Sequence, residues 1–285
     1  MKILNALPLA RRLLRRYDAH KGDSGKVLLI GGAPTMAGAL LLAGRASLYS
    51  GAGYTVLLML DAASAIVATE QPELMVHAAS RYGDPRQALA AMAPDAIAIG
   101  PGLGLDRLAQ SWLQAALDWD GPLVIDADAL TLLAKHTHLL EALRKRPQAS
   151  TLTPHPGEAA RLLGCSNHDI QADRTAVLQA LVAHTQSIVV LKGQHSLLGA
   201  PGQIPQQCGD GNPGMAVGGM GDVLTGCLAA LAAQGVRHHL SLWEASCLAV
   251  QAHALAADRL VAQGVGPVGL TPMQVAQEIR RVINS

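Results

Sequence analysis

The sequence contains no phenylalanine, and aromatic residues make up only 2% of its 285 residues. A hydrophobic core must therefore be built from Leu, Val, Ile, Ala and Met. The chain is 50% hydrophobic, which is ample for one large α/β domain. Charge is also sparse and balanced, with 22 Lys and Arg against 21 Asp and Glu. A net charge of +1 gives no reason to expect nucleic acid as a partner.

Cysteine is scarce, and Cys165, Cys208, Cys227 and Cys247 are too far apart to have metal-site spacing. We expect free thiols in a reducing compartment. No apolar run reaches about 18 residues without a glycine or a charge, so no membrane span is expected. At the N-terminus the arginines of residues 11–16 follow the short apolar piece, whereas a signal peptide has them before it. These absences predict a soluble, cytoplasmic protein with no membrane partner.

Short apolar runs alternate with helix-forming stretches along the chain. Residues 26–30 predict a buried strand that ends in Gly31-Gly32, residues 38–50 a helix, and residues 54–60 a second strand. This βαβ spacing is typical of parallel sheets. Further strands are predicted over residues 74–77, 96–99, 123–125, 151–153, 188–191 and 196–198. Further helices are predicted over 107–117, 129–135, 158–163, 170–184, 222–234 and 242–260, with a last helix capped by Thr271.

The pattern predicts an α/β fold in one domain, with a mainly parallel sheet and helices on both faces. In such sheets, ligands bind beyond the carboxyl ends of the strands. Several loops of glycine and polar residues follow those ends. We therefore expect the functional site along that edge.

The most informative stretch, residues 209–231, is rich in glycine before it becomes helical. A glycine turn that opens a helix presents free N–H groups to an anion such as phosphate. Asp222 lies where the helix would begin. It could cap the helix, or it could take a proton from a hydroxyl that attacks a phosphoryl group. The stretch alone leaves both roles open.

The other loops carry charged side chains. Asp126 and Asp128 could hold Mg²⁺ through water or cap a helix. His155 and Glu158, three residues apart, could face the ligand, although Glu158 also suits a helix N-terminus. Lys192 follows a strand and brings a cation. The chain has no P-loop, no Gly-x-Gly-x-x-Gly in its first turn and no Gly-x-Ser-x-Gly, which disfavours P-loop enzymes, Rossmann dehydrogenases and serine hydrolases of that fold.

Taken in order, these stretches resemble the ADP/ATP-dependent NAD(P)H-hydrate dehydratases of the ribokinase-like superfamily. The resemblance covers residues 20–280, and its last two blocks are the most specific. The matching stretches are Lys21-Gly22 with Gly25, Gly31-Gly32, 37–39 (AGA), 100–104 (GPGLG), 126–130 (DADAL), 153–158 (TPHPGE), 191–193 (LKG), 211–215 (GNPGM) and 218–226 (GGMGDVLTG).

The resemblance implies a repair enzyme. A nucleotide, ADP or ATP with Mg²⁺, would phosphorylate the hydroxyl of the S epimer of hydrated NADH or NADPH, and loss of phosphate would restore the cofactor. Asp222 would be the catalytic base, and Glu158 would order a metal–water network. By matching position, the hydrated dinucleotide would contact Ala39, Gly102, His155 and Asp222. The nucleotide would contact Lys192, Gly193, Gln194, His195, Ser196 and Gly221.

The chain departs from the family pattern at two places. The segment after Lys192-Gly193 is often Ala-Gly-Thr in the family but is Gln194-His195-Ser196 here, so His195 is expected to contact nucleotide through its backbone. The residue after the first glycine pair is often Ser but is Ala33 here, which removes a hydroxyl. Many relatives also carry an N-terminal epimerase domain. We expect none here, and therefore a separate epimerase as a partner. The resemblance further implies a homotetramer.

Two other functions compete with this interpretation. A small-molecule kinase of the same superfamily, acting on a vitamin precursor such as a hydroxymethylpyrimidine or a hydroxyethylthiazole, would share the glycine turn and the aspartate. The combined residues 153–158 and 211–215 favour the dehydratase. A nucleotide-binding module without activity is disfavoured because Asp222 is present.

Overall fold

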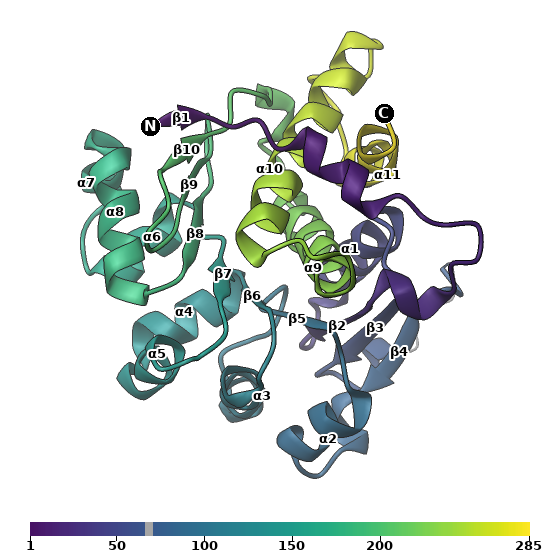
Figure 1. Cartoon of the computed structure of the whole chain (residues 1–285). Helices are drawn as coiled ribbons and strands as arrows, with labels where there is room; N and C mark the ends of the chain where they lie inside the picture. Colours follow the sequence, from purple (N-terminus) through teal and green to yellow (C-terminus); the bar gives the residue numbers. More distant parts are fainter. Residues whose placement is uncertain (66–70) are drawn as a thin grey trace.

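The alternating segments build one mixed sheet in the computed structural model, which describes residues 1–65 and 71–285 (Figure 1). The strands are β1 (Lys2–Ile3), β2 (Lys26–Gly31), β3 (Tyr54–Met59), β4 (Met75–Ala78), β5 (Ala96–Ile99), β6 (Leu123–Ile125), β7 (Ser150–Leu152), β8 (Ile188–Leu191), β9 (Leu197–Gly199) and β10 (Gln206–Gln207). In this described part of the chain the strand order is β1-β10-β9-β8-β7-β6-β5-β2-β3-β4. All neighbours from β8 to β4 are parallel, while β9 is antiparallel to both β8 and β10.

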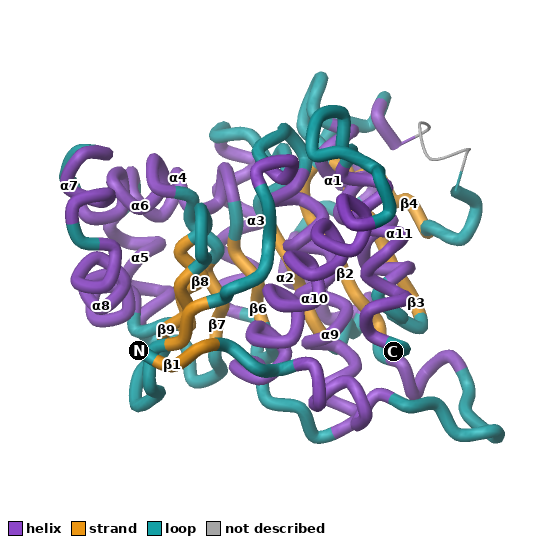
Figure 2. Tube along the Cα trace, turned by 90° about the horizontal axis from the view of Figure 1, so that it is seen from above, coloured by secondary structure: helices purple, strands orange, loops and turns teal. Residues whose placement is uncertain are grey.

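Helices cover both faces of the sheet (Figure 1), and the view from above shows the strands running side by side among them (Figure 2). They are α1 (Ala37–Tyr49), α2 (Pro85–Met92), α3 (Arg107–Asp118), α4 (Ala127–Lys135), α5 (Thr137–Arg144), α6 (Pro156–Leu163), α7 (Asn167–Ala172), α8 (Arg174–Thr185), α9 (Met220–His238), α10 (Leu242–Ala262) and α11 (Pro272–Ile283). Helices α1, α9, α10 and α11 share one apolar cluster, and α2 to α8 share the other. The predicted α/β fold class is confirmed.

Alternate residues of the central strands enter the two clusters because successive side chains of a strand point to opposite faces. In β5, Ala96 and Ala98 belong to the α9 side, whereas Ile97 and Ile99 belong to the α3 side. The small alanines let α9 approach the sheet closely. Trp112 of α3 is the largest fully buried side chain among the described residues.

The contact between α1 and α9 is especially close. A Cβ added to Gly226 would lie only 1.9 Å from the carbonyl oxygen of Ala43. On the other side of α1, a Cβ at Gly44 would lie 2.8 Å from Leu57 Cδ2 of β3. Small residues thus compensate for the missing phenylalanine, because they bring backbones together where a larger side chain would fill a gap.

Most predicted elements are found within two or three residues of their expected bounds, and those at 96–99, 123–125 and 188–191 match fully. The single helix expected over residues 170–184 is wrong. It is two helices, α7 and α8, because the Asp173 side chain caps a new start by accepting a hydrogen bond from Ala176 N at 2.9 Å. Helices α2 and α5 and strands β1 and β10 were not expected.

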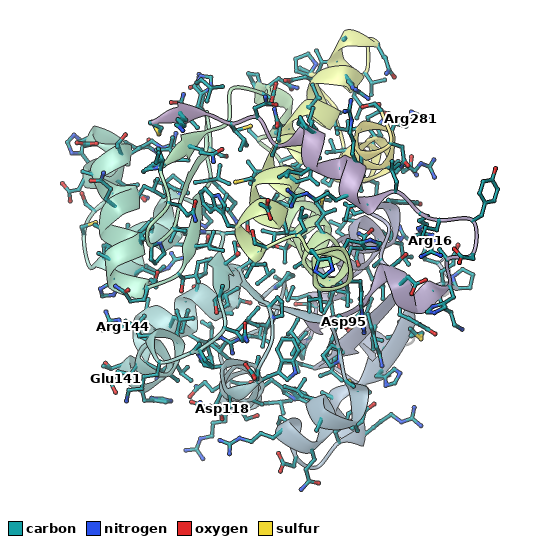
Figure 3. All side chains as sticks on the ribbon, in the orientation of Figure 1. Arg16, Asp95, Asp118, Glu141, Arg144 and Arg281 are labelled. Carbon is teal, nitrogen blue, oxygen red and sulfur yellow. The ribbon has the colours of Figure 1, made fainter. Side chains whose placement is uncertain are left out.

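The arginine-rich segment near the N-terminus is a 3₁₀ helix, η1 (Leu7–Leu13), which packs under α10 with Ala10 and Leu13 buried. Its Arg12 pairs with Glu244 of α10 at 2.9 Å. Figure 3 shows Arg16, Arg144 and Arg281 near the outline of the molecule, whereas Asp95 lies near the middle of the view. No helix in the described part of the chain combines the length and apolarity needed to cross a membrane.

The close contact between α1 and α9 predicts a position-specific cost for one added methyl group. Gly226→Ala should lower the free energy of unfolding by about 3 kcal/mol, because the Ala43 backbone cannot move aside without displacing α1. Gly38→Ala, on exposed α1 surface with no atom near the added Cβ, should raise it by up to about 1 kcal/mol. Urea unfolding of both variants measures the difference, and equal effects would contradict the close packing.

Candidate active site

Glycine turns follow β2 and β5 and lie against each other at the carboxyl edge of the sheet. The N–H of Ala33 donates to the carbonyl of Gly102 at 2.7 Å. A Cβ at Gly102 would lie 2.7 Å from that of Met36 and 3.5 Å from that of Ala39, and its φ of +57° favours glycine. Two predicted substrate contacts, Ala39 and Gly102, are therefore neighbours.

The centre of the site is an ion pair between Lys192, which follows β8, and Asp126, which follows β6. Lys192 Nζ lies 2.7 Å from Asp126 Oδ1, and Asp126 Oδ2 accepts a hydrogen bond from Thr225 Oγ1 of α9 at 2.8 Å. Asp126 is only 1% exposed, so a partner on each oxygen offsets the cost of burying its charge. This network joins two strand ends to α9.

Gly221, in the first turn of α9, borders the same ion pair. A Cβ there would lie 3.2 Å from Lys192 Nζ and 3.6 Å from Asp126 Oδ2. Glycine at this position therefore leaves room for the ion pair. The contact also places the start of α9 beside the loop that follows β8.

The two aspartates after β6 do not act as side-chain helix caps. Asp126 occupies the N-cap position of α4 without a capping hydrogen bond from its side chain. Asp128 instead accepts a hydrogen bond from Gly104 N at 2.9 Å and so holds the glycine turn after β5. The capping interpretation is wrong for Asp126.

His155 and Glu158 begin α6 as a reciprocal cap. Gly157 N donates to His155 Nδ1 at 3.0 Å, while Glu158 Oε2 accepts from His155 N at 2.7 Å. Because Nδ1 accepts, the proton of a neutral His155 ring lies on Nε2, which is 3.4 Å from Glu158 Oε1. The helix-start role considered for Glu158 is confirmed, and the same contacts fix the orientation of the His155 ring.

Asp222 is different, because its carboxylate is not used as a cap. The N-cap residue of α9 is Gly219, with a φ of +94°. Glycine has no side chain, so the N-cap residue offers no side-chain cap to this helix. Across residues 1–65 and 71–285, no donor is hydrogen-bonded to the half-buried Asp222 carboxylate. This outcome favours the base over the cap.

Electrostatics point the same way. Burial first, and then the nearby charge of Asp126, raise the pKa of Asp222 to about 7, although Lys192 opposes the shift. Burial likewise raises the pKa of Glu158 to about 7 against the influence of Lys192. A carboxylate with a pKa near neutrality is well matched to accept a proton at physiological pH.

The basic groups stay in single protonation states. Burial lowers the pKa of Lys192, but the carboxylates of Asp126 and Glu158 outweigh it and raise the pKa overall, so the ammonium persists. Burial and the Lys192 charge lower the pKa of His155, which keeps its imidazole neutral at pH 7. Lys192 is thus the cation of the cluster, and His155 is a neutral hydrogen-bonding group.

The structure brings together most of the predicted site residues. Around Asp126 gather His155, Glu158, Lys192, Gly221 and Asp222, linked by the contacts and charge interactions above. Ala39 and Gly102 adjoin one another. In the loop after β8, Gly193, Gln194 and His195 are exposed, and Ser196 Oγ donates to the carbonyl of Gly193 at 3.2 Å.

Protein side chains alone do not form a metal site in the described part of the chain. Within the described residues no group of three His, Cys, Asp or Glu side chains is arranged to hold a metal ion. Both oxygens of Asp126 are already taken by Lys192 and Thr225. The carboxylates of Glu158 and Asp222 suit Mg²⁺, which binds one or two carboxylates together with substrate phosphates and water.

Two contributors escaped the sequence reasoning. Thr225 lies three residues after Asp222, which places both side chains on one face of the helix. This spacing could have identified Thr225 as a site residue. Asp258 of α10 accepts hydrogen bonds from Gly211 N at 2.7 Å and Asn212 Nδ2 at 2.8 Å, which anchors the loop before α9. Asp258 is far in sequence from the loop that it holds, so no local pattern pointed to it.

The fold and this cluster define an α/β protein of the ribokinase-like class. The chain aligns with a ribokinase-like superfamily protein from Enterococcus faecalis with a TM-score of 0.82 and 28% identity, covering 100% of this chain and 95% of that one. It aligns with the crystal structure of an ADP/ATP-dependent NAD(P)H-hydrate dehydratase from Bacillus subtilis, co-crystallised with ATP/Mg²⁺, with a TM-score of 0.84 and 28% identity. That alignment covers 99% of this chain and 97% of the other.

Sequence comparison narrows the class to a family. The model of the NAD(P)H-hydrate dehydratase family matches residues 27–281, and the chain belongs to this family. It is 36% identical to an ADP-dependent (S)-NAD(P)H-hydrate dehydratase from Neisseria meningitidis, over 95% of this chain and 88% of that protein. It is 40% identical to a bifunctional NAD(P)H-hydrate repair enzyme from Coxiella burnetii over 95% of this chain, but spans only 52% of that relative.

The hydrogen bond from Thr225 to Asp126 can be tested separately from catalysis. Thr225→Val keeps the shape but removes the donor, so it should lower the free energy of unfolding by about 1–3 kcal/mol. Thr225→Ser retains the hydroxyl and should recover the part of this loss that is due to hydrogen bonding. Chemical unfolding measures both variants, and a Val variant as stable as the wild type would show that the bond contributes nothing.

Proposed function

We propose that this protein dehydrates the S epimer of hydrated NADH and NADPH, with ADP or ATP as phosphoryl donor, and so returns the damaged cofactors to use. The observation that carries the proposal is the state of the Asp222 carboxylate. It lies in the first turn of α9, after a glycine turn, does not cap the helix, and has a pKa raised to about 7. Family membership and the names of the relatives support the same activity.

The residues fit phosphoryl transfer to the added hydroxyl. The glycine turn before α9 offers N–H groups and the positive end of a helix to the transferring phosphoryl group. Asp222 takes the hydroxyl proton as the oxygen bonds to phosphorus and the donor's bond to that phosphorus breaks. Phosphate then leaves the ring with the bonding electrons, a neighbouring ring proton is lost, and the dihydropyridine double bond re-forms.

The remaining site residues position the two ligands. Ala39 and Gly102 form a close, small-residue surface for the dinucleotide, and neutral His155 presents an oriented ring to it. The nucleotide would lie along residues 192–196 and Gly221. Mg²⁺ would be held by Glu158 or Asp222 through water, together with the nucleotide phosphates, and would supply charge neutralisation.

The finer assignments follow from family resemblance. A separate epimerase activity would supply the S epimer, as the bifunctional names of several relatives suggest. We place the reaction in the cytoplasm and the protein in a homotetramer. In this proposal residues 1–285 form one dehydratase domain.

The direct test measures the recovery of intact cofactor. Purified protein with Mg²⁺ and ADP or ATP should restore 340 nm absorbance to hydrated NADH, and the same mixture without nucleotide should not. Hydroxymethylpyrimidine and hydroxyethylthiazole serve as competing substrates. Phosphorylation of either one, with no recovery of hydrated NADH, would identify a vitamin-precursor kinase instead.

Asp222→Asn tests the base. Turnover should fall by about 10²–10⁴-fold, because the amide cannot take the proton. In the wild type, kcat/KM should rise with pH and level off above about 7, where Asp222 is deprotonated.

As pH rises, the stability contributed by Asp222 should fall while activity rises. Because folding raises the pKa of Asp222, ionisation destabilises the fold as pH rises from about 4 to about 7. Asp222→Asn should therefore raise Tm above pH 7 and have less effect at pH 4. Glu141→Gln, which changes an exposed glutamate outside the cluster, should alter neither activity nor Tm. Wild-type turnover in Asp222→Asn would contradict the assignment.

A further inference from the structure

Arg174, the first residue of α8, reaches back to the loop that follows β8. Its Nη2 donates to the carbonyl oxygens of Leu191 at 3.1 Å and Lys192 at 3.3 Å. Its Nη1 donates to the carbonyl of Gln194. One guanidinium therefore holds three carbonyls within four consecutive residues, in a geometry that only arginine's fork of donors can match.

The loop is shaped to receive this guanidinium. A Cβ at Gly193 would lie 3.1 Å from Arg174 Nη2, and the φ of Gly193 is +136°. His195 adopts a φ of +52°, a left-handed conformation that a non-glycine residue rarely takes without support. The bonds from Arg174 to the preceding residues provide such support.

These bonds also determine where the loop's donors point. In a trans peptide the carbonyl and the following N–H point in opposite directions. Because the carbonyls of Lys192 and Gln194 face Arg174, the N–H groups of Gly193 and His195 face away from it. Lys192 N is itself fixed by a hydrogen bond to the carbonyl of Pro154 at 2.9 Å. The loop is thus held on one side and presents its N–H groups on the other.

We infer that Arg174 is a positioning residue for the nucleotide. It touches no reacting atom but holds residues 191–194 so that the loop's N–H groups meet the phosphates or sugar of ADP or ATP. This inference rests on the proposed function only in taking the loop as the nucleotide site. It assigns to Arg174 a role in nucleotide affinity and none in binding the hydrated dinucleotide.

The experiment measures nucleotide binding by calorimetry with Mg²⁺–ADP and Mg²⁺–ATP, with no hydrated dinucleotide present. Arg174→Ala should raise the dissociation constants of both nucleotides by about tenfold or more, because several charge-assisted hydrogen bonds to the loop are lost. Arg174→Lys keeps one cation without the fork and should fall between the wild type and Arg174→Ala. In the dehydration assay the KM for nucleotide should rise similarly, while the KM for hydrated NADH stays within about threefold.

Arg144→Ala is the matched control. Arg144 of α5 donates to the carbonyl of His184 near the other end of α8, far along the helix from the loop, and is labelled in Figure 3. Its loss should lower Tm without changing nucleotide affinity. A purely structural role for Arg174 predicts the same pattern, namely lower Tm with unchanged dissociation constants, and that result would overturn the inference.

The two proposals fail in different ways. If the wild type binds nucleotide but does not restore NADH from its hydrate, the dehydratase proposal is refuted. The role of Arg174 is still tested in that case, by the nucleotide dissociation constants of its variants. An equal rise in both KM values in Arg174→Ala would refute the positioning role while the dehydratase stands. A wild type that binds neither nucleotide would refute both.

Discussion

The ion pair between Lys192 and Asp126 is the interaction on which the site depends. It places the one ammonium of the cluster among the carboxylates of Asp126, Glu158 and Asp222, so they cannot all be ionised at low cost. Asp126 holds the lysine at the shorter distance and has Thr225 as a second partner. Glu158 and Asp222 are left with elevated pKa values. The division of roles among the carboxylates follows from burial, which raises the pKa values of Glu158 and Asp222, and from the direct contact of Lys192 with Asp126.

The fold makes this arrangement possible because parallel strands end at a common edge. The residues that follow β6 and β8 meet there, although 66 residues separate Asp126 from Lys192. Helix α9 then brings a third element to the same place, and Gly221 leaves the space that the ion pair occupies. The loop before α9 is held by Asp258 from α10, so helices on one face of the sheet also support the site.

Sequence reasoning predicted the parts that depend on local pattern. Alternating apolar runs and glycine turns located the parallel strands, and the loops after them hold nearly all the candidate site residues. The glycine stretch alone left cap and base open for Asp222, and only the other loops and the family resemblance favoured the base, because the difference depends on a tertiary position that no local pattern encodes. It missed the break at Asp173, where a side-chain cap interrupts a continuous helical pattern. The partners of Asp126 were also hidden, since both lie far away in the chain.

The close contact at Gly226, where an added Cβ would lie 1.9 Å from the carbonyl oxygen of Ala43, has a consequence for how this protein can diverge. Helix α1 carries Ala39 and helix α9 carries Gly221 and Asp222, so this crossing fixes the spacing between the proposed dinucleotide contact and the proposed base. A larger residue at the crossing would separate the two ligands and would affect every substrate alike. Changes in donor or cofactor preference are therefore expected to accumulate in exposed loops such as residues 193–196, where substitutions leave that spacing intact. Gln194-His195-Ser196, where the chain departs from the family pattern, lies in such a loop.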